Sequence, residues 1–314
     1  MENKLNLPLK KKKNEAASPR LDPLMRALKA LHSAGAPEAM TEEELEHQRC
    51  SQEVLGRLTA PMAGMDYEEF SLGGMNAAWM RLKVPHGSRH AILYCHGGGY
   101  TSGNLGYARV LASKLAHVTG YDVLSFEYRL APEHPYPAAV EDALRAWDHL
   151  MLLGYGARDI VLAGDSAGGN LALVLCHRLK AAGRRLPGAL VLMSPWTDMT
   201  MSGASYAERA ESDPMLTPEY IEAVRTAYAG GRDYASPDLS PLFADLTGFP
   251  PTLIQAGDHE ILYSDAEMLC HALERAGVPC RFEVSEAMWH VFQMFPLRKA
   301  AAAMESVARF LLER

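Results

Sequence analysis

Short apolar runs alternate along the chain with longer segments whose apolar residues recur at helical spacing. The short runs have the length of strands buried on both faces, and they lie at 91–95, 123–126, 160–163, 190–193 and 252–256. The longer segments have apolar residues every three or four positions, and they lie at 107–118, 138–153, 170–180 and 296–312. This alternation predicts a mostly parallel sheet covered by helices on both faces.

Four further segments extend this pattern. Residues 69–84 alternate between apolar and polar around Gly73-Gly74, which predicts an antiparallel hairpin. Residues 281–284 predict a last short strand. Residues 21–58 have leucines at helical spacing and predict two helices, and residues 199–240 predict a helical insert between two strands.

Composition limits the class of protein. The 314 residues are 48% hydrophobic, enough for a large core, and the net charge of −7 does not favour a nucleic acid or an anionic membrane as partner. No run of 18 apolar residues predicts a membrane span, and the lysines at 10–13 lead into polar residues rather than a secretory apolar segment. Five scattered cysteines favour free thiols in a reducing compartment, so we expect a cytoplasmic protein.

The strand at 160–163 leads into a glycine-flanked serine. Gly164 and Gly168 lie two residues on either side of Ser166, and the next helix follows at once. Glycine is suited to a sharp turn at which strand and helix must approach closely. The pattern Gly-x-Ser-x-Gly is the nucleophile elbow of α/β-hydrolases, although a glycine-rich turn that only begins a helix would have the same pattern. Ser166 is therefore a candidate nucleophile.

The strand at 91–95 leads into His96 and three glycines. Consecutive backbone N–H groups can converge on one point there, because no Cβ atom obstructs the approach. Such a group of donors stabilises an anion, and in acyl transfer that anion is the tetrahedral oxyanion. The sequence therefore predicts an oxyanion hole at 97–99.

A serine nucleophile needs a base that accepts its proton and a carboxylate that orients the base. His290 follows the last predicted strand, where the chain order serine, acid, histidine places the base. Asp258, Glu260 and Asp265 follow the preceding strand. Asp265 lies where a helix begins and is expected to be a first-turn residue, so Glu260 and Asp258 are the candidates for the acid.

Five motifs in this order resemble the hormone-sensitive-lipase-like family of α/β-hydrolases across residues 70–295. They are His96-Gly97-Gly98-Gly99, Tyr128-Arg129-Leu130-Ala131-Pro132-Glu133-His134, Gly164-Asp165-Ser166-Ala167-Gly168-Gly169, Ser194-Pro195-Trp196-Thr197-Asp198 and His290-Val291-Phe292. The resemblance implies an α/β-hydrolase fold with a mostly parallel eight-stranded central sheet, flanking helices and a helical cap. The expected divisions are a solvated tail at 1–20, a cap from 21–60 and 199–240, and a catalytic domain from 61–198 and 241–314.

The resemblance implies a catalytic triad of Ser166, His290 and an acid. The Asp-Pro-Leu that most members carry at the acid is missing here. We favour Glu260, thirty positions before His290, because some members resemble Gly-x-x-Glu-Val-Leu at this point, and Asp258 is the alternative.

The resemblance also assigns the residues around the triad. The implied oxyanion donors are the N–H groups of Gly98, Gly99 and Ala167. The implied supporting residues, which organise the loop without exchanging protons with substrate, are His96, Gly97 and Asp165.

The resemblance implies a serine carboxylesterase that hydrolyses short-chain acyl esters of small molecules without a metal or organic cofactor. A lactone or amide hydrolase, or a deacetylase, would use the same residues. A non-catalytic small-molecule receptor on this fold would lack the base, and the presence of His290 argues against it. The resemblance further implies a homodimer.

Overall fold

The computed structural model describes residues 64–84 and 89–313 and part of the N-terminal segment, namely residues 23, 25–26, 28–29, 41, 43, 45–46, 48–50 and 62. The described positions within 23–29 and 43–50 are helical, in agreement with the two helices expected there. The predicted tail at 1–20 and the rest of the predicted N-terminal cap segment lie outside the described residues.

The core of the molecule is one eight-stranded sheet, as predicted, with the strand order β1-β2-β4-β3-β5-β6-β7-β8. The strands are β1 (Met65–Leu72), β2 (Met75–Leu82), β3 (Ala91–Cys95), β4 (Asp122–Phe126), β5 (Ile160–Asp165), β6 (Ala189–Met193), β7 (Thr252–Gly257) and β8 (Cys280–Ser285). The β1–β2 hairpin is antiparallel and pairs antiparallel with β4, whereas all other neighbours are parallel. The predicted hairpin and the mostly parallel sheet are thus confirmed.

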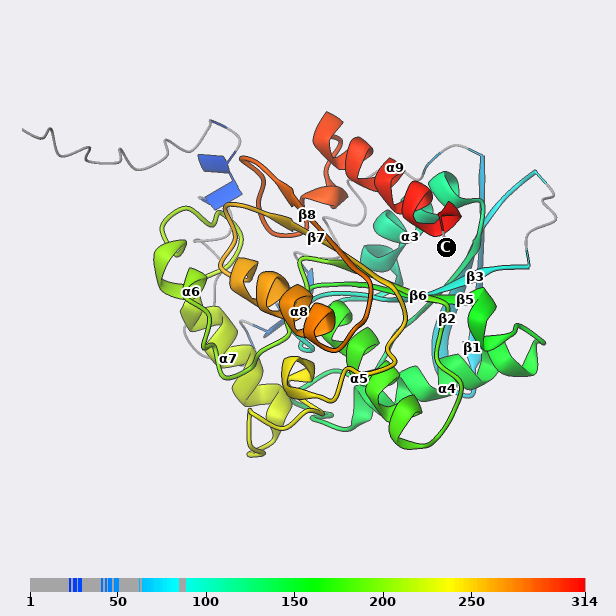
Figure 1. The fold of residues 1–314 in the computed structure, drawn as a ribbon, viewed down its shortest axis with the longest axis horizontal. Coiled ribbons are helices and arrows are strands. Elements are labelled where there is room, and N and C mark those ends of the chain that lie inside the picture. The colour runs from blue at the N-terminus through cyan, green and yellow to red at the C-terminus, as the bar shows by residue number, and fades with distance from the viewer. Residues whose placement is uncertain are drawn as a thin grey trace, which may run out of the picture.

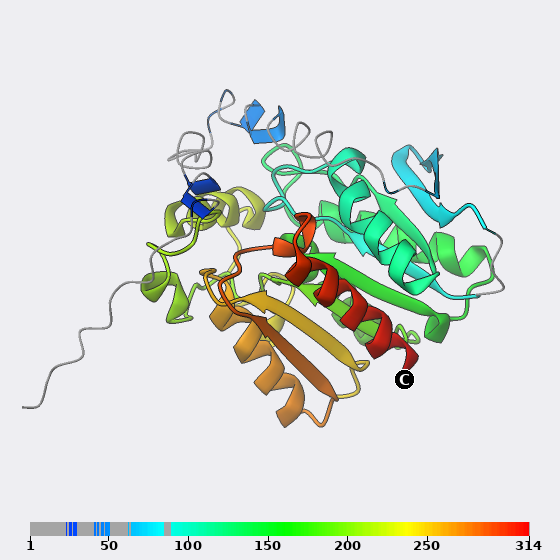
Figure 2. The ribbon, with the colours of Figure 1, turned by 90° about the horizontal axis from the view of Figure 1, so that it is seen from above.

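Helices follow the strands in regular alternation. They are α3 (Leu105–Thr119), α4 (Ala138–Leu152), α5 (Ala167–Ala181), α6 (Ser205–Glu208), α7 (Pro218–Ala229), α8 (Tyr263–Arg275) and α9 (Arg298–Leu312), with short 3-10 turns at Ala157–Asp159, Pro241–Phe243 and Phe292–Met294. Helices α3 and α9 lie side by side over one face of the sheet, and α4, α5 and α8 cover the other (Figures 1 and 2).

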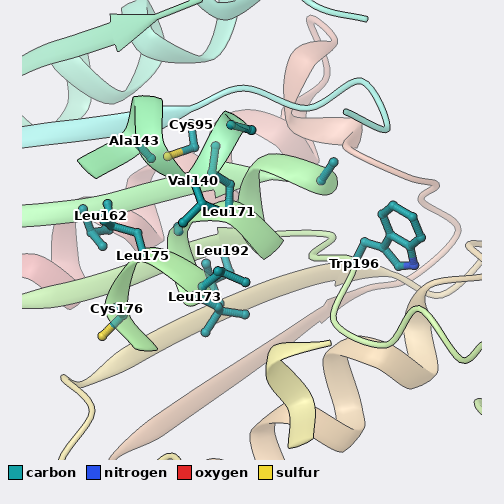
Figure 3. Close-up of a cluster of buried hydrophobic side chains, with 14 of the residues drawn as sticks. Cys95, Val140, Ala143, Leu162, Leu171, Leu173, Leu175, Cys176, Leu192 and Trp196 are labelled. Atoms are coloured by element: carbon teal, nitrogen blue, oxygen red, sulfur yellow. The ribbon is translucent and has the colours of Figure 1, made fainter. Parts of the chain in front are cut away.

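Strand residues alternate between the two hydrophobic layers, as a sheet buried on both faces requires. On β5, Val161 packs on the side of α3 and α9, and Leu162 packs on the side of α4 and α5. Figure 3 shows part of the second layer, with Leu171 of α5 next to Val140 of α4. Because every position of β5 is buried, the residue that follows the strand is held by a rigid support.

Helical spacing places Ala300, Met304, Val307 and Leu311 on one face of α9, and all four are buried. Ala301 is exposed, whereas Phe310 is buried beside this face.

The segment between β6 and β7, predicted as a helical insert, is only partly helical, since α6 and α7 account for 4 and 12 residues. It lies at the same end of the molecule as the described N-terminal helical residues (Figures 1 and 2). Gln48 Nε2 donates to Tyr220 Oη of α7 at 2.6 Å and joins the two segments. Among the described residues, none of the helices has the length and apolar character needed to cross a membrane.

Candidate active site

Ser166 lies in a sharp turn between β5 and α5. Its backbone has φ 53° and ψ −122°, a strained conformation for a residue with a side chain. The flanking glycines allow it: a Cβ atom on Gly164 would lie 2.3 Å from Gly168 O, and one on Gly168 would lie 2.0 Å from Cys95 O. Ser166 N also donates to Met193 O at 3.0 Å, which fixes the turn against the end of β6.

The glycine loop after β3 lies against the start of α5, since a Cβ atom on Gly168 would also contact His96 O at 2.5 Å. Gly98 and Gly99 have φ of 111° and 62°, and Gly98 O accepts hydrogen bonds from the N–H groups of Thr101 (3.1 Å) and Ser102 (3.0 Å). Within the described part of the chain, no group accepts a hydrogen bond from the backbone N–H of Gly98, Gly99 or Ala167. Two adjacent segments therefore supply three unpaired donors next to Ser166.

Asp165 is hydrogen-bonded to this glycine loop. Its fully buried carboxylate accepts hydrogen bonds from Gly97 N at 2.9 Å, from Tyr107 Oη at 2.6 Å and from Tyr94 Oη. Burial raises the pKa of Asp165, and the tyrosine hydrogen bonds oppose that shift. The carboxylate thus holds the loop backbone, and within the described part of the chain it makes no hydrogen bond with the Ser166 hydroxyl.

His96 is packed within the same loop. Its ring stacks on Tyr128 with centroids 4.1 Å apart, and its Nδ1 donates to Gly97 O at 2.8 Å. Burial lowers the pKa of His96 to about 4, so the imidazole is neutral near pH 7. His96 and Gly97 thus belong to the glycine loop, and Asp165 contacts it from the end of β5.

His290 contacts one of the two candidate carboxylates. Its Nδ1 lies 2.8 Å from Glu260 Oε2, and both side chains are buried. The other carboxylate oxygen of Glu260 accepts from Gly257 N at 2.8 Å. Asp258 is more exposed and pairs with its neighbour His259 at 2.6 Å. Glu260 is therefore the carboxylate placed to orient the His290 ring.

Ser194 is a site residue to which the sequence assigns no role. It follows β6 with φ 48° and is fully buried. Its Oγ donates to Glu260 Oε1 at 3.1 Å and accepts from Val291 N at 3.0 Å. The sequence does contain one signal for this role, because Ser194 directly follows a buried strand and therefore lies at the edge of the sheet where the other site residues lie.

The serine and histidine segments meet at the end of β6. Met193 O accepts a hydrogen bond from Ser166 N, and Oγ of the following residue, Ser194, accepts one from Val291 N. In the described residues Ser166 Oγ makes no hydrogen bond with His290, a contact that often tightens only when substrate is bound. His290 Nε2 thus remains available to a hydroxyl group.

Helix α7 lies over the glycine loop. A Cβ atom on Gly99 would lie 2.9 Å from Tyr220 Oη and 3.0 Å from Val224 Cγ1. Burial raises the pKa of Tyr220 to about 12. Tyr100, the residue after Gly99, stacks on Tyr228 at 3.6 Å between centroids, and Trp196 is buried in the core.

Comparison with known proteins agrees with this geometry. Residues 92–294 match a family model described as alpha/beta hydrolase fold. An acetyl-hydrolase of Streptomyces hygroscopicus is 38% identical over 83% of this chain and 86% of its own length. An esterase of Acinetobacter venetianus is 36% identical over 73% of this chain and 77% of its own.

The fold is also similar to that of solved esterase structures. The crystal structure of an esterase from the bacterial hormone-sensitive lipase family superimposes with a TM-score of 0.86 and 35% identity, covering 95% of this chain and 99% of that one. The family match, the relatives and the fold together carry one conclusion: the chain belongs to the hormone-sensitive-lipase-like family of α/β-hydrolases.

Proposed function

We propose that the protein is a serine carboxylesterase that hydrolyses short-chain acyl esters through an acyl intermediate on Ser166. The observation that carries the proposal is the buried contact between His290 Nδ1 and Glu260 Oε2 at the end of the sheet where Ser166 lies. The esterase and the acetyl-hydrolase among the relatives support the same reaction class.

Acylation follows from the proposed roles. His290 Nε2 accepts the proton of Ser166 Oγ as that oxygen attacks the ester carbonyl carbon, and Glu260 holds the proton on Nδ1 so that Nε2 is the base. The carbonyl oxygen becomes the oxyanion and accepts hydrogen bonds from the N–H groups of Gly98, Gly99 and Ala167. Collapse of the tetrahedral intermediate breaks the bond to the alcohol, which leaves with the proton from His290.

Deacylation repeats these steps with water. His290 removes a proton from a water molecule, whose oxygen attacks the acyl carbon and forms a second oxyanion in the same hole. Ser166 Oγ leaves, takes the proton back from His290, and the carboxylic acid is released. No metal or organic cofactor enters either step.

The cap supports a preference for short acyl chains. We assign residues 21–60 and 199–240 to the cap, and residues 61–198 and 241–314 to the catalytic domain. The 2.6 Å hydrogen bond between Gln48 and Tyr220 joins the two parts of the cap, and Tyr220 and Val224 lie directly over Gly99. Because Tyr220 and Val224 lie close to the proposed oxyanion donors, little room remains for a long acyl chain between α7 and the glycine loop.

A series of p-nitrophenyl esters of increasing acyl length, with a lactone and an anilide alongside, tests the function. We expect the highest kcat/KM for the acetate or butyrate ester, and no hydrolysis by a folded Ser166→Ala variant. Turnover at the wild-type rate by Ser166→Ala would refute the mechanism, and a preference for the lactone or anilide would replace the esterase assignment.

The acetyl-hydrolase relative favours deacetylation of a larger metabolite as a second candidate. Release of acetate from acetylated small molecules, compared with release from p-nitrophenyl acetate, separates the two. The homodimer and the cytoplasmic location implied by the sequence stay predictions; size-exclusion chromatography with light scattering tests the first.

A further inference from the structure

The insert between β6 and β7 is hydrogen-bonded to the loop that carries Glu260. Arg209 Nη1 donates to Asp258 O at 2.6 Å, and its guanidinium lies over the Tyr263 ring at 3.7 Å. Ser205 Oγ accepts from Ser264 N at 2.9 Å and donates to Ile261 O. The first half of the insert is therefore hydrogen-bonded to the acid loop, residues 258–264, near both of its ends.

Asp213 is the central contact of this arrangement. The side chain is 2% exposed, and its Oδ2 accepts from Ile261 N at 2.8 Å, across 48 residues of sequence. Its Oδ1 accepts from Met215 N at 2.8 Å and Leu216 N at 3.0 Å. One buried carboxylate thus joins the insert backbone to the peptide group that follows Glu260.

Both the carboxylate and the backbone of Glu260 are held by hydrogen bonds. The Glu260 carboxylate is held by Gly257 N, Ser194 Oγ and His290. Its backbone is held on the following side by the bond from Ile261 N to Asp213. Burial raises the pKa of Asp213 to about 6, and the charge of His290 and the N–H donors to the carboxylate oppose that shift.

We infer that Asp213 is a positioning residue, which acts from the insert through the Ile261 peptide group to hold Glu260 against His290. The first half of the insert is then a fixed support of the acid loop, while α7 remains the part that faces substrate. This inference rests on the proposed triad.

Asp213→Asn is the direct test, because the amide keeps the volume but has only one acceptor oxygen for three N–H groups and lacks the charge. We expect kcat for p-nitrophenyl acetate to fall about tenfold with KM nearly unchanged, since misplaced catalytic groups lower the rate of the chemical step. A merely structural role would lower the folded fraction and leave kcat per folded molecule unchanged.

Two matched variants complete the test. Asp233→Asn alters an exposed carboxylate of the same insert, which among the described residues accepts a hydrogen bond only from Ala235 N, and should leave kcat unchanged. Ser205→Ala removes the parallel contact to Ile261 with a smaller change of volume, so it tests the support if Asp213→Asn does not fold. It too should lower kcat rather than raise KM.

A double-mutant cycle with Glu260→Gln separates this inference from the proposed function. If Asp213 acts through Glu260, Asp213→Asn should cost little further rate in the Glu260→Gln background. Equal rate losses in both backgrounds, or a folded Asp213→Asn enzyme with wild-type kcat beside an impaired Glu260→Gln enzyme, would overturn the inference alone. A full-rate Glu260→Gln enzyme would overturn the triad.

Discussion

The choice of Glu260 as the acid predicts a large difference between two conservative substitutions. In Glu260→Gln the side chain keeps its shape but has one acceptor oxygen and one NH₂ group. The oxygen is held at the Oε1 position by Gly257 N at 2.8 Å and Ser194 Oγ at 3.1 Å. The NH₂ group then faces His290 Nδ1, where Glu260 Oε2 lies at 2.8 Å in the wild type.

This arrangement forces the wrong tautomer on His290. An NH₂ donor requires Nδ1 to be an acceptor, so the ring proton moves to Nε2, which then has no lone pair for the Ser166 proton. The corresponding carboxylate-to-amide change in a serine protease triad lowers kcat about 10⁴-fold. That factor corresponds to about 5.4 kcal/mol of activation free energy, at 1.36 kcal/mol per tenfold.

Asp258→Asn is the matched control. Asp258 is part-exposed, and its carboxylate pairs with His259 rather than His290, so we expect kcat within about twofold of wild type. The assay is steady-state hydrolysis of p-nitrophenyl acetate at neutral pH, with circular dichroism to verify folding. A Glu260→Gln enzyme within tenfold of wild type would refute the assignment, as would a larger loss in Asp258→Asn.

Three further predictions address the surroundings of the site. Gly168→Ala should lower the free energy of unfolding by about 3 kcal/mol or more in urea titrations, since its Cβ atom would lie 2.0 Å from the backbone oxygen of Cys95; unchanged stability would contradict the close approach. Ser194→Ala should lower kcat about tenfold with KM little changed, because Glu260 loses a hydrogen bond; a higher KM at constant kcat would argue otherwise. Burial raises the pKa of Asp265 from 3.8 to about 8, so the folded state binds the extra proton and wild-type stability falls as pH rises through that window. Asp265→Asn should flatten this dependence in denaturation midpoints across the window, and an unchanged slope would refute the attribution.

The sequence predicts the sheet because the signals for its strands are local. Every position of β3, β5 and β6 is buried, and such strands appear in the sequence as short apolar runs. The elbow is local in part: a Cβ atom on Gly164 would meet Gly168, four positions along the chain, whereas Gly168 is required by its approach to Cys95 at the end of β3.

The contacts that organise the acid depend on the tertiary fold. Ser194 and Val291 are 97 positions apart, and Asp213 and Ile261 are 48 apart, so no spacing rule connects them. Their positions in the sequence also leave both Asp258 and Glu260 as candidates for the acid of the triad. The turn after β7 distinguishes them, because it brings Gly257 N to Glu260 and leaves Asp258 beside His259.

The order of strands explains why these distant contacts are rigid. The glycine loop, Ser166, Ser194, Glu260 and His290 follow β3, β5, β6, β7 and β8, which are consecutive neighbours in the sheet. Parallel strands end at the same edge, so each loop contacts the next. Hydrogen bonds join Ser166 to Met193, Ser194 to Glu260 and Glu260 to His290. A substitution that loosens one of these loops should therefore act on the rate of the chemical step, whereas changes in α7, which lies over Gly99, should act on the choice of substrate.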